Sequence, residues 1–386
     1  MSDMRKIIFD EFVRLNRGFD LPESMIVDGE YPVVASTNIK AYHNAYKVKP
    51  PVVVTGRSGS LGKVQYIDSK CWPLNTSLYS KDFRGNNPKY IYYFLQTMHL
   101  EQYNAGAGVP TLNQNHLQRL KIIVHDIDEQ KKVSDILTTY DNLIENNNKR
   151  IKLLEQMAEN LYKEWFVRFR FPGYETVEFE GKSPKCWNQL RLDQFGIQLE
   201  SGARPKGGIN SSIDDGVPSL GAESVKGLAE FDYSDVKLIP EEFYRKLKRG
   251  KNRGNHILIY KDGAYIGKVT LFKYGFPFER FAINEHVFFM NSIRAEYQNY
   301  LYFTLKQTSY FTLMQNLNRN AAQPGLSQLD INRIKIIEPD QVTVISFNDI
   351  IEPILKKVFQ LAKKNHLLIK QRDMLLPRLM SGKLEV

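Results

Sequence analysis

The sequence predicts an α+β protein in which two mixed α/β modules are separated by two long antiparallel coiled-coil helices. Three observations support this prediction. A segment of the first half recurs 214 residues later, and apolar residues recur every three or four positions over two long stretches. Within each half, short β-branched runs lie beside helical stretches, as in mixed α+β globules. The repeat also predicts an internal pseudo-two-fold symmetry.

The repeat is densest just before each long periodic stretch. Residues 106–126 align without a gap on residues 320–340, and nine of the 21 positions are identical. Chance does not give that density. The match is looser upstream, where residues 56–64 resemble residues 261–269. We therefore expect two copies of one architecture with different surfaces.

Two stretches of about 38 residues have the three-and-four spacing of coiled coils. At 1.5 Å per residue each would be roughly 57 Å long, which argues against an ordinary amphipathic helix. Pro353 is expected to bend or break the second helix. The residues predicted to pair the two helices are Leu137, Tyr140, Ile144, Asn147, Ile151, Leu154 and Leu161 in the first, and Ile351, Ile354, Val358, Leu361, Asn365, Leu368 and Leu375 in the second.

These patterns divide the chain into five segments. Pro172, Gly173 and Pro184 mark the region between the two halves as a linker. The predicted segments are a first module over 1–126, a first long helix over 127–167, a linker over 168–187, a second module over 188–339, and a second long helix with a tail over 340–386.

The charge balance favours a polyanionic partner. Lys and Arg total 53 against 43 Asp and Glu, which gives a net charge of +10. Nucleic acid is the usual partner of such a chain, although a merely basic protein is about equally compatible with charge alone. Two cysteines and no long apolar run predict a cytoplasmic protein without disulfides or a membrane span.

Motifs for catalysis and cofactors are weak. The glycine loops at 56–63 and 263–268 lack the spacing and the Ser or Thr of a phosphate-binding loop, and the seven histidines lack metal-ligand spacing. Catalytic groups can lie far apart in sequence, so two alternatives stay open beside DNA binding. One is a single-chain DNA methyltransferase or nuclease, and the other is a coiled-coil adaptor without a DNA role.

Several polar and basic clusters are candidates for contact with DNA, because cations neutralise phosphates and Arg can bridge guanine O6 and N7. They lie before the first β core, in the two glycine loops, on a Gly- and Pro-rich turn, and in a run of six basic residues. The candidates are Asn38, Lys40, Tyr42, His43, Arg57, Ser58, Lys63, Arg204, Lys206, Arg245, Lys246, Lys248, Arg249, Lys251, Arg253 and Lys268. If the helices pair antiparallel, the modules would enter DNA about one helical turn apart and read a split, asymmetric site.

The chain resembles the specificity subunit of type I restriction-modification systems along essentially its whole length. The resemblance is carried by RLNRGFDLP at 14–22, by residues 53–64, 108–117 and 121–133, and by RDMLLPRLMSGKL at 372–384. It implies two DNA target-recognition domains and no catalysis in this chain. It also implies two methyltransferase (M) subunits that bind S-adenosylmethionine and dock on the helices, and restriction (R) subunits that use ATP.

One departure concerns the second glycine loop. In the gapless alignment Asp262 stands opposite Arg57, and Ala264 stands opposite Gly59. A base contact proposed for Arg57 is therefore not expected of Asp262.

Overall fold

The computed structural model describes residues 4–181, 183–208, 215–317 and 325–385, so residues 320–324 of the internal repeat lie outside it. The chain forms two compact units. The first unit comprises Met1–Glu145 and Leu367–Val386, and the second unit is Asn146–His366. Unlike the predicted segments, these units each contain part of both long helices.

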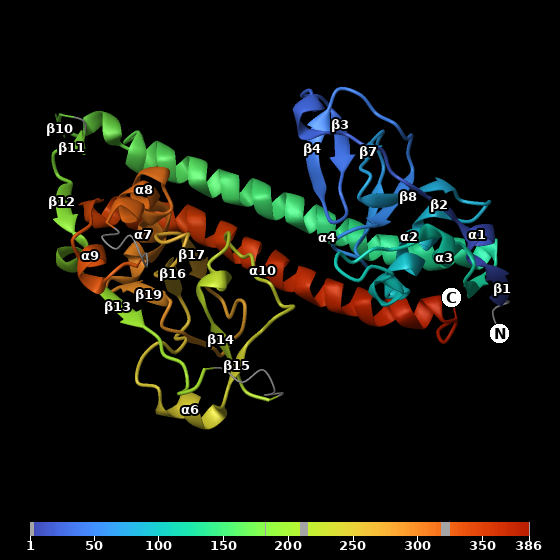
Figure 1. Ribbon diagram of the computed structural model, residues 1–386. Coiled ribbons are helices and arrows are strands. Elements are labelled where there is room, and N and C mark those ends of the chain that lie inside the picture. The colour runs from blue at the N-terminus through green and yellow to red at the C-terminus, as the bar shows by residue number, and fades with distance from the viewer. Residues whose placement is uncertain (1–3, 182, 209–214, 318–324, 386) are drawn as a thin grey trace. The chain divides into compact units, whose positions relative to one another are not determined.

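The first unit holds three sheets and three short helices beside its share of the long helices (Figure 1). Within the three-stranded sheet β3 and β7 are parallel, and the other pairings are antiparallel. In sheet order the strands are β1 (Met4–Ile8) and β9 (Lys121–His125); β2 (Arg14–Arg17), β8 (Ser77–Asp82), β5 (Val52–Gly56) and β6 (Val64–Ile67); and β4 (Ile39–His43), β3 (Tyr31–Val34) and β7 (Trp72–Pro73). The helices are α1 (Phe9–Phe12), α2 (Pro88–Thr97) and α3 (Gln114–Gln118).

The second unit repeats this topology and adds helices. Its parallel pair is β14 with β18. In sheet order the strands are β12 (Asn188–Arg191) and β20 (Lys335–Glu338); β13 (Ile197–Ser201), β19 (Val287–Ser292), β16 (His256–Tyr260) and β17 (Val269–Phe272); and β15 (Leu238–Ile239), β14 (Val217–Leu220) and β18 (Ala282–Ile283). The helices are α5 (Leu192–Phe195), α6 (Glu241–Lys246), α7 (Gln298–Leu305), α8 (Thr308–Asn316) and α9 (Gln328–Asn332).

The sheets of the two units correspond strand by strand. The order β2-β8-β5-β6 in the first unit matches β13-β19-β16-β17 in the second, and β4-β3-β7 matches β15-β14-β18. The flanking pair β1-β9 likewise matches β12-β20. The predicted α+β class with a duplicated architecture is confirmed at the level of topology.

The long helices are α4 (Ile127–Tyr162), of 36 residues, and α10 (Gln341–Met380), of 40 residues. In the second unit they lie side by side in opposite directions, since Tyr162 contacts Phe347 while Asn147 bonds Asn365 (Figure 1). In the first unit the two helices also contact each other, because Arg372 of α10 donates to Asp141 of α4 at 2.7 Å.

The predicted pairing stripe faces inward on both helices. Leu137, Asn147, Ile351, Val358, Leu361, Asn365 and Leu368 are buried, and the remaining predicted positions are half-buried. In the second unit the stripe is extended by aromatic residues, because Tyr162 stacks on Phe303 of α7 and donates a hydrogen bond to Thr304. The helix pair is therefore part of each unit's hydrophobic core.

Pro353 does not break α10, which runs through it as one helix. The missing N–H removes one backbone hydrogen bond, whereas Ile351 and Leu355 on either side are fully buried. Glu352 also accepts hydrogen bonds from Lys273 and Tyr274, which follow β17. Packing thus holds the helix where local propensity disfavours it.

The segment predicted as a linker is partly packed. It contains β10 (Phe179–Glu180) paired with β11 (Ser183–Pro184), and Phe171 stacks on Trp187 with ring centroids 5.0 Å apart. Both aromatic rings belong to the core of the second unit. In the part of the chain that the structure describes, no helix combines the length and apolarity needed to cross a membrane.

Candidate nucleic-acid interface

A glycine-containing loop follows a buried strand in each unit. Residues 57–63 join β5 to β6, and residues 261–268 join β16 to β17. The first loop opens at Arg57, whose N–H donates to the Thr76 carbonyl at 2.8 Å and whose carbonyl accepts from the Leu112 N–H at 2.8 Å. Two distant segments therefore clamp this residue.

Lys261 occupies the corresponding place in the second loop. Its N–H donates to the His286 carbonyl at 3.0 Å, and its carbonyl accepts from the Leu326 N–H at 3.0 Å. Lys261 is thus the structural equivalent of Arg57. The gapless alignment, which sets Asp262 opposite Arg57, is wrong at this point.

The gapless alignment of the two loops fails because the second loop has one extra residue between its two glycines. Gly59 and Gly62 have φ of +85° and +86°, and Gly263 and Gly267 have φ of +124° and +82°. These left-handed positions favour glycine in both loops, but their spacing is three in the first and four in the second. Gly263, and not Ala264, therefore takes the place of Gly59.

Carbonyls at equivalent positions of the two units anchor the two cationic side chains. A guanidinium N–H of Arg57 donates to the Asn75 carbonyl at 3.3 Å, and Nζ of Lys261 donates to the Glu285 carbonyl at 3.0 Å. A guanidinium has five N–H donors and an ammonium has three. Each side chain therefore keeps donors that a phosphate oxygen can accept.

In the second unit a hollow of about 660 Å³ opens beside Lys261. Arg249, Asp262, His286 and Gln328 also line it. His286 Nδ1 lies 3.2 Å from the Asp262 carboxylate. Cationic, anionic and amide groups thus surround one concavity, which suits a ligand with both charged and hydrogen-bonding edges.

The basic run from Arg245 to Arg253 begins on α6 and continues as a loop. Arg245 and Lys246 pair with acids one turn back on α6 at 2.9 Å and 2.6 Å. Lys251 donates to the Arg245 carbonyl at 3.0 Å, and Arg253 lies 3.5 Å from Glu200. Four of the six basic side chains in this run therefore already make ion pairs or hydrogen bonds within the second unit.

Lys248 and Arg249 are exposed, and neither makes an ion pair with another described residue. Arg249 faces the hollow beside Lys261. Of these two cations, Arg249 is therefore the one that lies beside the second glycine loop.

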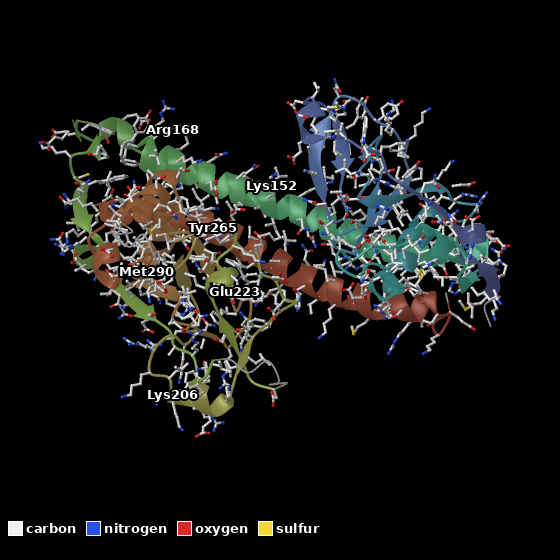
Figure 2. The ribbon with its side chains drawn as sticks, viewed as in Figure 1. Lys152, Arg168, Lys206, Glu223, Tyr265 and Met290 are labelled. Atoms are coloured by element: carbon white, nitrogen blue, oxygen red, sulfur yellow. The ribbon has the colours of Figure 1, made fainter. Side chains whose placement is uncertain are left out.

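The turn at 201–208 carries Arg204 and Lys206. The Arg204 Nε lies 2.5 Å from Glu285 Oε1, and the Arg204 side chain remains 54% exposed. Lys206 is exposed, and Figure 2 shows it at the end of the second unit where α6 also lies in this view. Arg204 therefore belongs to the cluster around the second loop.

The remaining loop candidates are placed around the same features. Ser58 donates its N–H to the Thr76 carbonyl at 3.1 Å, next to the Arg57 bond. Lys63 and Lys268 follow the second glycine of their loops and are both exposed. The two lysines are thus structural equivalents, as the sequence comparison predicts.

The first-unit candidates before the β core lie on or beside β4. Asn38, Lys40 and Tyr42 are exposed. Lys40 pairs with Glu23 at 2.5 Å, and this hydrogen bond lowers the pKa of the Glu23 carboxyl. These three residues form a polar surface of the first unit.

His43 does not belong to that surface. Its side chain is buried, its ring meets Trp72 edge-on at 5.3 Å, and its Nδ1 lies 3.1 Å from the Val27 backbone. Alternation along β4 turns it inward, because successive strand residues face opposite sides. The expectation that His43 contacts DNA is therefore corrected to a structural role.

Sequence reasoning missed four residues that surround the anchored cations. Asp20 and Asn75 lie in the first unit, and Glu285 and His286 lie in the second. They come from segments outside the glycine loops, and only Asp20 lies in a segment singled out by sequence, the stretch 14–22. Among the described residues, no group of three or more His, Cys, Asp or Glu side chains could hold a metal ion.

The chain is similar to proteins of one functional class. Residues 9–156 match the type I restriction modification DNA specificity domain. The type I restriction enzyme MjaIX specificity subunit of Methanocaldococcus jannaschii is 27% identical over 361 residues, which cover 88% of this chain and 78% of that protein. The HindI specificity subunit of Haemophilus influenzae is 22% identical over 77% of each chain.

The fold also matches a solved structure. The crystal structure of the type I restriction-modification S subunit from M. genitalium superposes with a TM-score of 0.63 at 16% identity. The superposition covers 98% of this chain and 96% of that one. At this identity the likeness establishes a shared fold along nearly the whole chain.

Proposed function

Because this chain is a specificity subunit of the type I restriction-modification family, we propose that it reads a split, asymmetric DNA site. Each compact unit contributes one recognition domain, and each domain reads one half of the site. The supporting observation is the duplicated clamp around Arg57 and Lys261, set among side chains that differ between the units. The shared protein framework can hold the DNA backbone in the same way in both half-sites, and the side chains that differ between the units can contact different bases.

Electrostatics supports double-stranded DNA as the ligand. The net charge is +10, and exposed cations gather around the second loop at Arg204, Lys248 and Arg249. Phosphate neutralisation by such residues gives affinity without sequence preference, whereas groups in the hollow can contact base edges. One surface thus supplies both kinds of contact.

The repeat supports two methyltransferase subunits as partners. Leu153 on α4 and Leu367 on α10 occupy equivalent places in the repeat and are 60% and 58% exposed. Exposed apolar surface is commonly buried in contacts with other proteins when it forms a patch, and we take these two equivalent positions as the centres of two such contacts. Two equivalent sites suit two copies of one subunit, and restriction subunits that use ATP complete the nuclease.

In this proposal the chain itself performs recognition, and adenine methylation takes place on the partner subunits, which bind S-adenosylmethionine. The target adenine is flipped into the partner's site, as base-modifying enzymes require. The complex works in the cytoplasm of a prokaryotic cell, where its DNA substrate lies.

The test is to co-express the full chain with its methyltransferase partner in a host that lacks other adenine methylation. Sequencing of the methylated adenines should return one motif with two different half-sites and a fixed spacer. Binding of that motif by the purified complex should weaken steeply with salt, because bound phosphates release counterions.

Two outcomes would contradict the proposal. One is a single contiguous or symmetric motif, and the other is methylation without sequence preference. Saturable binding of S-adenosylmethionine by the isolated chain would oppose the assignment of catalysis to the partners.

A further inference from the structure

The two units contain an equivalent glycine at which one strand passes very close to another segment. Gly18 follows β2, and a Cβ atom there would lie 2.2 Å from the Leu74 carbonyl oxygen. Gly202 follows β13, and a Cβ atom there would lie 1.7 Å from the Ile283 carbonyl oxygen. The pairing of β2 with β8 and of β13 with β19 gives these glycines the same register.

Two residues beyond each glycine, the side chains of the two units carry opposite charges. Asp20 stands in the first unit and Arg204 in the second. Asp20 accepts a hydrogen bond from the Asn75 side chain, and the Arg204 Nε lies 2.5 Å from Glu285 Oε1. The backbone carbonyls of Asn75 and Glu285 are the ones that anchor the two loop cations.

When equivalent positions of the two units are compared, the hydrogen-bond donor and the acceptor have therefore exchanged places. In the first unit the exposed turn offers the carboxylate and the anchoring segment offers the donor. In the second unit the turn offers the guanidinium and the anchoring segment offers the carboxylate. The clamp beside them is the same, because Arg57 and Lys261 keep both backbone bonds and the side-chain bond.

We propose that Asp20 and Arg204 are specificity-determining residues, each selecting a base in its own half of the DNA site. Arg204 selects guanine, and Asp20 selects a base that presents an amino group in the major groove, cytosine or adenine. Arg57 and Lys261 hold the DNA backbone for both. This inference rests on the proposed function and assigns residues to it.

The chemistry follows from the groups that each side chain presents. A guanidinium can donate two hydrogen bonds to guanine O6 and N7, whereas a carboxylate accepts from the amino group of cytosine or adenine. Both side chains are accessible, since Asp20 is 75% exposed and Arg204 is 54% exposed. Exposed ion pairs contribute little to stability, so the contact of Arg204 with Glu285 can be exchanged for a base.

The anchored cations serve a different purpose. Arg57 in the first unit and Lys261 in the second carry the same charge and bond to backbone groups at equivalent positions. A contact shared by two domains that recognise different sequences cannot distinguish those sequences. Phosphate is the shared group of all DNA sequences, and a positioned cation binds it without regard to the base.

The experiment compares variants of the full chain in the methyltransferase complex by mapping methylated adenines and by competition binding. Arg204→Gln should relax the preference for guanine at one position of one half-site by roughly ten- to a hundredfold and leave the other half-site unchanged. Asp20→Asn should relax one position of the opposite half-site. Arg204→Lys keeps the charge but loses the two-pronged geometry, and it should also lose the preference.

Matched controls separate base selection from general affinity. Arg191→Gln removes another exposed arginine of the second unit, one that pairs with Asp193 and is not a candidate DNA contact, and it should leave the recognised motif unchanged. Lys261→Ala should weaken binding to all sequences alike and reduce the slope of log affinity against log salt by about one.

The inference is overturned if the Arg204 variants keep the parental motif, or if they weaken all sequences equally. A parent complex that shows no sequence-specific methylation would instead overturn the proposed function, and this assignment with it. A changed motif in only the predicted half-site supports both.

Discussion

At the scale of single residues, His256 connects the basic loop of the second unit to its sheet. Its Nε2 accepts the Arg253 N–H at 2.7 Å, which places the ring proton on Nδ1 and directs it to Asn291 Oδ1 at 2.8 Å. The ring is buried and stacks on Phe289 with centroids 4.0 Å apart. Protonation of Nε2 would remove the acceptor that holds Arg253.

This arrangement predicts a loss of stability in acid. Burial lowers the pKa of His256 below its ordinary value near 6.5, while the nearby Glu200 opposes that shift and Arg253 adds to it. Below pH 6.5 the unfolded chain takes up a proton that the folded chain refuses, so the free energy of unfolding falls until the folded pKa is reached. Urea unfolding of the parent and of His256→Gln between pH 7.5 and 5 should show a flatter pH dependence in the variant.

His125 contributes in the same direction, because burial also lowers its pKa. The parent and the variant are therefore compared by the difference of their slopes and not by the parental slope alone. Equal slopes in the two proteins would contradict the structural role given to His256.

At the scale of elements, a buried asparagine pair fixes the register of α4 against α10 in the second unit. Asn147 donates to Asn365 at 2.8 Å, and Asn365 donates to Asn148 at 2.7 Å. The spacing of apolar residues predicts the stripe, because a helix of 3.6 residues per turn returns to the same face every three or four positions. Polar residues inside such a stripe specify alignment at a cost in stability.

A double-mutant cycle tests this role. Asn147→Leu should destabilise the protein by roughly 1–3 kcal/mol, because it deprives Asn365 of a buried donor. The double variant Asn147→Leu with Asn365→Leu should recover much of that loss through apolar packing. Urea unfolding gives the coupling energy, and strictly additive effects of the two substitutions would refute the pairing.

Two predictions from the sequence fail. One is that Pro353 breaks the second long helix, and the other is the residue-by-residue alignment of the two glycine loops. Local propensity ends a helix at proline, but burial of Ile351 and Leu355 outweighs one lost hydrogen bond. The insertion between Gly263 and Gly267 leaves no trace in a short gapless comparison. Only the backbone bonds to Arg57 and Lys261 reveal which residues are equivalent.

At the scale of the whole molecule, duplication explains why the fold is predictable and the site is less so. The class and the long helices follow from periodicity and from the repeat, which can both be read directly from the sequence. The surroundings of the loop cations depend on Asp20 and Asn75 in the first unit and on Glu285 in the second, and within each unit these residues reach the loop only after the sheets form. The polar residues around His43 in the sequence predict that it contacts DNA, but its side chain lies on the inward face of β4 and is buried.

Duplication also predicts the stoichiometry of the assembly. Leu153→Asp and Leu367→Asp each place a charge on one of two equivalent exposed apolar sites. The parent should bind two methyltransferase subunits, each single variant should bind one, and the double variant should bind none. Native mass spectrometry or analytical ultracentrifugation measures this directly.

Lys152→Asp, one residue away on α4, is the matched control (Figure 2). It changes the charge of an exposed position without removing an apolar side chain, and it should leave the stoichiometry at two. Retention of two partners by the double leucine variant would show that the methyltransferase subunits dock elsewhere.

Because both long helices are shared between the units, the core of the first unit depends on residues that are synthesised long after its N-terminal part. Leu376, Leu379 and Met380 complete the core that also contains Val133 and Leu137. A ribosome adding about 5–20 residues per second makes these contributions roughly ten to fifty seconds apart. The nascent N-terminal half must therefore wait with an unfinished apolar surface, and a transcript cut short would yield a product that chaperones and proteases can recognise.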